Sequence, residues 1–162
     1  MKRLLAVPLL AAALLVGAPP AMAGPPSDAE GEWTYEVVSV DMRFAGNTTF
    51  VYGTEVSTFF GTFDGSATDE FVVVCHMQRP DLYRVFVKGT IAFDGMVDGQ
   101  DGTMTMKFVG KETSTTCEPS SAIWSGTWTI IGGTDELSDL HGHGTWTGPS
   151  GTLDYEGQIH FD

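Results

Sequence analysis

Basic residues and helix-forming patterns are both scarce in this chain of 162 residues. Lysine and arginine together number eight against 21 acidic residues, which gives a formal net charge of −13. An electrostatic field of that sign repels nucleic acids and anionic membranes, so neither is expected as a partner. No stretch beyond residue 23 has a sustained apolar period of 3.6 residues, and the 20 glycines disfavour long helices. A helical fold is therefore excluded.

The short motifs of common enzymes are also missing. The sequence contains no Gly-x-Ser-x-Gly elbow, no phosphate-binding loop and no recognised zinc motif. Most charged residues fall on strand faces that we interpret as outward, whereas Glu55, Glu70 and His76 lie on strands whose faces are ambiguous. Because an enzyme needs acids or bases pointing at its substrate, the residues favour a non-catalytic protein without a cofactor.

Residues 1–23 have the three parts of a secretory signal peptide. Lys2 and Arg3 are followed by an apolar run over residues 4–16 and by the small-residue site Ala21-Met22-Ala23. We expect cleavage after Ala23 and a secreted or periplasmic protein, with residues 24–31 as a flexible lead-in and residues 32–162 as one β-barrel domain. The remaining 139 residues carry six basic and 21 acidic side chains, a formal charge of −15, because both lost charges are positive.

Only two cysteines are present, Cys75 and Cys117. In an oxidising compartment two cysteines predict one disulfide bond. A reactive or metal-binding cysteine is the alternative, and the absence of a Cys-x-x-Cys motif disfavours it.

What the sequence does contain is a repeated strand signal. Eight Gly-Thr dipeptides occur between Gly53 and Thr152, most of them beside short alternating apolar runs, where we expect the glycine to serve a turn or bulge. Period-2 patterns predict eight strands, separated by turn residues, near 32–43, 48–62, 67–77, 82–93, 102–111, 121–131, 140–147 and 152–161. In the first strand the apolar phase slips at Val37-Val38, which predicts a β-bulge that restores one inward face. The fold class is all-β, a single antiparallel eight-stranded barrel.

A barrel of eight strands is just wide enough to be filled by side chains or to hold one small ligand. We expect an inward set rich in aromatic residues, which are candidates for ligand contacts: Trp33, Tyr35, Tyr83, Trp124, Trp128 and Tyr155. A solidly packed core without a cavity is the alternative.

Three histidines form a weaker candidate site. His141 and His143 lie on one strand face, and the turn at 147–152 would place His141 opposite His160 and His143 opposite Gln158. This register makes a surface metal site geometrically possible. We nevertheless expect ordinary histidines on an outer polar face and no metal.

The segment from Trp124 to Trp146 carries a family resemblance. It runs through Gly-Gly-Thr-Asp-Glu-Leu and then Leu-His-Gly-His-Gly. This resembles an uncharacterised bacterial family with an allene-oxide-cyclase-like barrel, in which a strand leads into Gly-Thr-Gly-Glu-Leu, then Leu-x-Gly-x-Gly and a final hairpin. Plant dirigent proteins have a similar turn. Residues 61–71 and 88–95 also fit the family pattern, whereas Asp135 stands where its turn has a second glycine. The resemblance implies an allene-oxide-cyclase-like fold.

The resulting expectation for function is an exported barrel that binds a small apolar or aromatic molecule in its lumen without catalysis. One alternative is a cyclase- or isomerase-like enzyme acting in the same lumen, which would require a buried carboxylate or tyrosine cluster. A second alternative is a small outer-membrane barrel, which the terminal Asp162 and the two cysteines disfavour.

Overall fold

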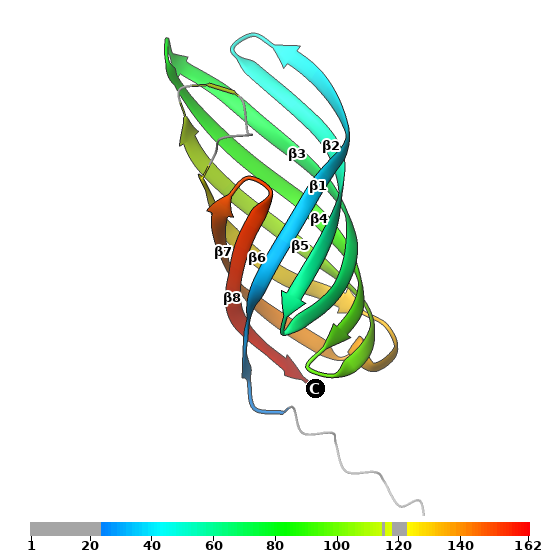
Figure 1. Ribbon diagram of the computed structural model, residues 1–162. Helices are drawn as coiled ribbons and strands as arrows, with labels where there is room; N and C mark the ends of the chain where they lie inside the picture. The colour runs from blue at the N-terminus through cyan, green and yellow to red at the C-terminus, as the bar shows by residue number, and fades with distance from the viewer. Residues whose placement is uncertain (1–23, 115, 118–122) are drawn as a thin grey trace, which may run out of the picture.

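The computed structural model describes residues 24–114, 116–117 and 123–162, so the predicted signal peptide lies outside the described residues. The described residues form eight antiparallel strands and one short 3-10 helix, η2 (Figure 1). The strands are β1 (Ser27–Ala45), β2 (Thr48–Gly61), β3 (Phe63–Arg79), β4 (Leu82–Val97), β5 (Gln100–Ser114), β6 (Ile123–Gly133), β7 (Leu140–Pro149) and β8 (Thr152–Phe161), with η2 (Asp135–Leu137) between β6 and β7. No helix of the described residues is long and apolar enough to cross a membrane.

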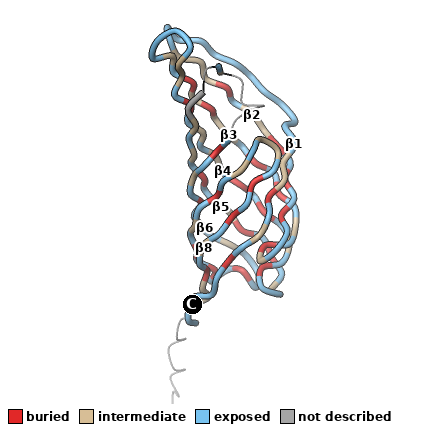
Figure 2. The backbone as a smooth tube through the Cα atoms, turned by 60° about the vertical axis from the view of Figure 1, so that its left-hand side comes forward, coloured by how far each residue is buried: buried red, intermediate tan, exposed pale blue. Residues whose placement is uncertain are grey.

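Each strand pairs with the next, and β8 pairs with β1, so that the eight strands close into a ring. This confirms the predicted all-β class, the number of strands and their order. Buried and exposed residues alternate along most strands, as the period-2 sequence pattern requires (Figure 2). The interior therefore receives one face of every strand.

The first strand begins earlier than predicted. Residues 27–31, predicted as part of a flexible lead-in, pair with β8, and Ala29 is buried. This stretch, Ser-Asp-Ala-Glu-Gly, has Ala29 as its one apolar side chain besides the glycine, so no apolar alternation marks it as a strand.

The predicted bulge is present, since the register between β1 and β2 shifts between Val37 and Ser39. The buried inward face expected beyond it is absent. Val40, Met42 and Phe44 are all exposed, Phe44 at 75%, because pairing with β8 ends at Thr34 and β1 projects with β2 beyond the closed ring (Figures 1 and 2). We call this end of the molecule the mouth, and the end that holds both chain termini and η2 the base.

The base is closed by η2, which places the fully buried Leu137 against Gly102. Asp135, which stands where the resembling family has glycine, has a φ of 55°. Aspartate is one of the few side chains that tolerate this left-handed conformation. Asp135 therefore takes a conformation that glycine also adopts readily.

Several of the Gly-Thr glycines lie within strands rather than at turns. Gly144 of β7 lies under the indole of Trp128, and a Cβ built on it would lie 2.0 Å from the backbone oxygen of Glu156 and 2.6 Å from the Trp128 ring. Gly126 has the same relation to Trp146. These glycines serve close packing of aromatic rings against the sheet, which corrects the expectation that the repeated dipeptide marks turns and bulges.

We expect the substitution Gly144→Ala to lower the free energy of unfolding by about 2 kcal/mol, because the new methyl group overlaps backbone that cannot move. Denaturation in urea measures the loss. Gly132→Ala is the matched control, since nothing lies within 4 Å of a Cβ at Gly132. Equal effects of the two substitutions would contradict the packing role of Gly144.

Candidate functional site

The base half of the interior is filled with stacked aromatic rings. Phe63 and Tyr155 stack with ring centroids 4.8 Å apart, and Trp33 and Phe59 stack at 5.3 Å. Trp128 meets Phe63 edge-on at 5.4 Å. Such offset and edge-to-face contacts are the favoured geometries of aromatic pairs. This half matches the packed-core alternative.

A cavity of about 210 Å³ lies nearer the mouth. Trp33 separates the two regions, because its ring contacts both the packed cluster and the cavity. The wall is almost entirely apolar and comes from all eight strands and the β7–β8 turn: Trp33, Tyr35, Val37, Glu55, Phe71, Val87, Phe108, Trp124, Trp146, Ser150 and Leu153. Val37, which is 47% exposed, lies on the side open to solvent.

The structure divides the six aromatic residues predicted to contact a ligand. Trp33, Tyr35 and Trp124 line the cavity. Trp128 and Tyr155 belong to the packed base, where the Tyr155 hydroxyl accepts a hydrogen bond from Phe63 N (2.9 Å) and donates one to the carbonyl of Phe60 (3.2 Å). Burial raises the pKa of Tyr155 to about 12. Tyr83 packs against the core without lining the cavity.

Two buried carboxyl groups stand beside the cavity, and the sequence did not assign them to it. Glu55 of β2 and Asp69 of β3 are directly paired in register, with exposed fractions of 6% and 0%. Glu55 lines the cavity. The hydroxyl of Ser57 donates a short hydrogen bond to Asp69 Oδ2, and Trp33 Nε1 donates to Ser57 Oγ at 3.0 Å. A connected polar chain thus runs from the cavity wall to Asp69.

The second oxygen of Asp69, Oδ1, receives no hydrogen bond from a backbone or hydroxyl donor of the described residues. The neighbouring carboxyl of Glu55 supplies a donor only when it is protonated. Burial, followed by the nearby negative charge of Asp69, raises the pKa of Glu55 to about 8. Burial likewise raises the pKa of Asp69 to about 6, against the opposing hydrogen bond from Ser57. At neutral pH the pair therefore shares one proton and carries about one negative charge.

One signal in the sequence pointed weakly to this pair. Asp69 alternates with Phe71, Val73 and Cys75, which places all four on one face. The pattern of β2 does not indicate whether Glu55 faces inward. The opposite face, with Tyr52, Val56 and Phe60, is as apolar as the inward one.

The three histidines lie on the outer surface in the predicted register, His141 opposite His160 and His143 opposite Gln158. The rings of His141 and His160 stack at 5.3 Å, and both approach the carboxylate of Asp162, at 3.0 and 3.7 Å. Among the residues that the structure describes, no group of three ligating side chains is arranged to hold a metal ion.

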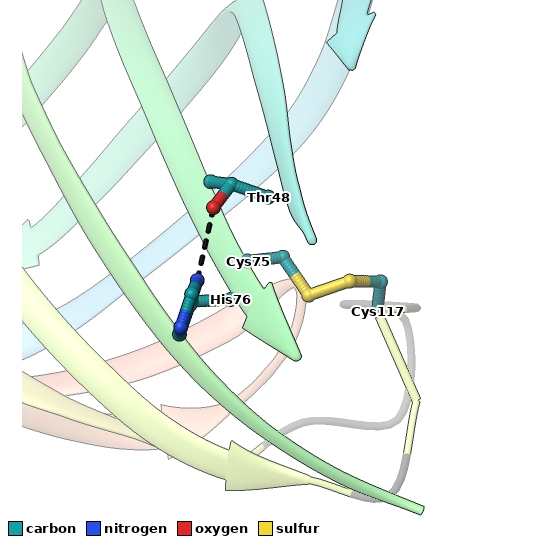
Figure 3. The surroundings of a disulfide bond; sticks show 4 residues. All are labelled: Thr48, Cys75, His76 and Cys117. Atoms are coloured by element: carbon teal, nitrogen blue, oxygen red, sulfur yellow. Dashed lines mark hydrogen bonds between the residues drawn. A yellow bond between two sulfur atoms is a disulfide. The ribbon is translucent and has the colours of Figure 1, made fainter. Parts of the chain in front are cut away.

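Cys75 and Cys117 form a disulfide bond, as predicted (Figure 3). Cys75 is buried on the inward face of β3 near the mouth, whereas the adjacent His76 points outward and shares a hydrogen bond of 2.9 Å with the hydroxyl of Thr48. The bond ties the segment that follows β5 to β3, so it fixes the chain at the open end of the ring.

Comparison with known proteins supports the fold and gives no information about activity. No protein-family model and no curated protein sequence matches the chain. A crystal structure from Shewanella oneidensis MR-1, of a protein with unknown function from the DUF3224 family, superposes with a TM-score of 0.66 and 15% sequence identity, covering 85% of this chain and 98% of that one. At this identity the likeness extends to the fold alone, so the chain is similar in architecture to a DUF3224 protein.

Proposed function

We propose that the protein binds a small apolar or aromatic molecule in the cavity near the mouth, outside the cytoplasm. The cavity itself carries the proposal, since its wall is built almost wholly from aromatic and aliphatic side chains and joins the open end of the ring. Ligand sites are typically apolar concavities with a few placed polar groups, and Glu55, Tyr35 and Ser150 fill that role here. The disulfide and the signal-peptide pattern of residues 1–23 support export.

The volume sets the size of the ligand. An apolar cavity of about 150 Å³ in another protein holds benzene, and a water molecule in the liquid occupies about 30 Å³. The 210 Å³ available here suits a single ring with a short substituent. We also propose that the fold is related to allene-oxide-cyclase-like barrels. The ring of eight sequential strands and the resemblance of residues 124–146 both support this relationship.

We expect propylbenzene to change the tryptophan emission and to raise the melting temperature, because Trp33, Trp124 and Trp146 line the cavity and a ligand bound to the folded state stabilises it. At a ligand concentration of about 100 times Kd the stabilisation is about 2.7 kcal/mol. Fluorescence titration and thermal denaturation measure both effects.

A variant that fills the cavity provides the control. Val87→Phe adds a ring at the cavity wall and is expected to abolish both effects, whereas Val109→Phe makes the same change on the exposed face of β5 and should leave them intact. An unchanged response in Val87→Phe, or no response of the unaltered protein to a panel of substituted benzenes, would contradict binding in this cavity.

The buried carboxyl pair favours one second candidate, a cyclase- or isomerase-like enzyme. A carboxylic acid at the wall of an apolar cavity with a pKa near neutrality is suited to transferring a proton to or from a bound substrate. The test is incorporation of deuterium from D2O into a bound carbon acid, followed by mass spectrometry. Exchange that is lost in Glu55→Gln, with binding retained, would favour the enzyme, whereas binding without exchange would leave the non-catalytic function.

A further inference from the structure

The shared negative charge of Glu55 and Asp69 has no counter-ion in the described part of the chain. All six lysine and arginine side chains there are exposed on the outside: Arg43, Arg79, Arg84, Lys88, Lys107 and Lys111. The groups that act on the pair are the two carboxyls themselves and the hydroxyl of Ser57. Because charges buried in protein interiors are normally paired, a buried carboxyl that lines a cavity without a cation points to a ligand that supplies one.

The indole N–H groups of the cavity wall already donate to protein acceptors. The three indole nitrogens that belong to the wall donate within the protein: Trp33 Nε1 to Ser57 Oγ, Trp124 Nε1 to Ser150 Oγ and Trp146 Nε1 to the carbonyl of Thr127, at 3.0, 3.0 and 3.2 Å. Besides the hydroxyls of Tyr35 and Ser150, the wall therefore offers a ligand the faces of aromatic rings and the carboxyl oxygens of Glu55. Ring faces and carboxylates both attract cations.

We infer that the ligand is an organic ammonium ion, a primary or secondary amine on an apolar body of about one ring, with its N–H groups donating to Glu55 and its body packed among the indoles. The inference deepens the proposed function and rests on it. The cation replaces the missing counter-ion of the carboxyl pair, and the apolar body accounts for the rest of the wall. A carboxylate or phosphate ligand is disfavoured, because it would add negative charge to a site that already carries it.

This assignment predicts how binding depends on pH. The titratable groups facing Glu55 are Asp69 from β3 and Tyr35 from β1, whose pKa is raised chiefly by burial. Glu112 of β5 is paired with the buried Val85 and so shares the inward face nearer the mouth. An adjacent ammonium favours the ionised form of Glu55, so binding expels a proton and strengthens as pH rises from 6 to about 9, until the amine itself loses its charge near its own pKa of about 10.

The experiment compares ligands that share one phenyl ring and differ in charge. Binding of 2-phenylethylammonium, propylbenzene and 3-phenylpropanoate is measured by isothermal titration calorimetry at pH 6, 7.5 and 9. We expect the ammonium to bind at least about tenfold more tightly than propylbenzene at pH 9, because it donates a charge-assisted hydrogen bond to Glu55 that propylbenzene cannot make. We expect the propanoate to bind most weakly. Repeating the titration at pH 7.5 in buffers of different ionisation enthalpy counts the protons released, up to one for each ammonium bound.

Glu55→Gln removes the ionisable group while preserving its shape. The variant is expected to bind the ammonium about tenfold more weakly at pH 9 and to lose the pH dependence, with the affinity for propylbenzene unchanged. Glu70→Gln, exposed on the outer face of β3, is the matched control. If propylbenzene binds as tightly as the ammonium and no proton is released, the ammonium assignment is wrong while the cavity still binds ligands. If none of the three ligands binds, the proposed function fails as well.

Discussion

Replacing Glu55 with glutamine is expected to raise the free energy of unfolding at pH 9 by up to roughly 5 kcal/mol, given about 1.4 kcal/mol for each pH unit by which folding raises the pKa of Glu55. The pKa values of Glu55 and Asp69 are raised by folding, to about 8 and about 6 from ordinary values of 4.5 and 3.8. Between the ordinary and the raised values the folded chain holds protons that the unfolded chain has released. Stability therefore falls as pH rises through this window and levels off above about 8.

Urea denaturation at pH 5, 7 and 9 measures this dependence. The unaltered protein should lose stability toward pH 9, and Glu55→Gln should lose less, because its amide donates to Asp69 without requiring a proton. Glu70→Gln changes the same chemical group on an exposed position and should follow the unaltered protein. Identical pH profiles for Glu55→Gln and the unaltered protein would contradict a raised pKa of Glu55 in the folded state.

Reduction of the disulfide is expected to lower the free energy of unfolding by about 4 kcal/mol in the chain-entropy model for a loop of this length. The bond joins residues 42 apart in sequence, so its loss frees a large loop in the unfolded state. Urea denaturation with and without a thiol reductant gives the difference. We expect ligand uptake to weaken as well, because the bond lies at the mouth end of β3, where Cys75 pairs with Thr49.

The double variant Cys75→Ala/Cys117→Ala separates the bond from side effects of the reductant. Without reductant, its free energy of unfolding should already equal that of the reduced unaltered protein, and adding a reductant should not change it. Intact mass should rise by two hydrogens on reduction of the unaltered protein. Two thiols that label freely before reduction would overturn the pairing.

The architecture could be predicted well from the sequence, because apolar and polar residues alternate along most strands. Strand positions, the bulge at Val37, the facing of His141 and His160 and the pairing of Cys75 with Cys117 all follow from period 2, turn chemistry and export. Each of these features follows from a local or pairwise rule and does not depend on how the interior is packed.

The candidate site was harder to predict, because it depends on which face of an ambiguous strand turns inward. Glu55 and Ser57 occupy inward positions that alternation normally gives to apolar residues, and Tyr52, Val56 and Phe60 face outward at 40%, 48% and 50% exposure. The division of the aromatic residues between packed base and cavity depends on strand tilt and on the glycines beneath the rings. Neither is visible in a one-dimensional pattern.

The closure of the ring by β1 and β8 bears on how the chain folds. Thr34 pairs with Thr152 and Ser27 with Ile159, partners that are 118 and 132 residues apart. All other strand pairs join neighbours in the sequence and can form as hairpins while the chain is incomplete. The entropic cost of closing so long a loop is offset only after β8 has formed and paired with β1, which makes this step slow. Until the ring closes, the unpaired edges of β1 and β8 can pair with strands of other chains, so the risk of aggregation is greatest between synthesis and closure.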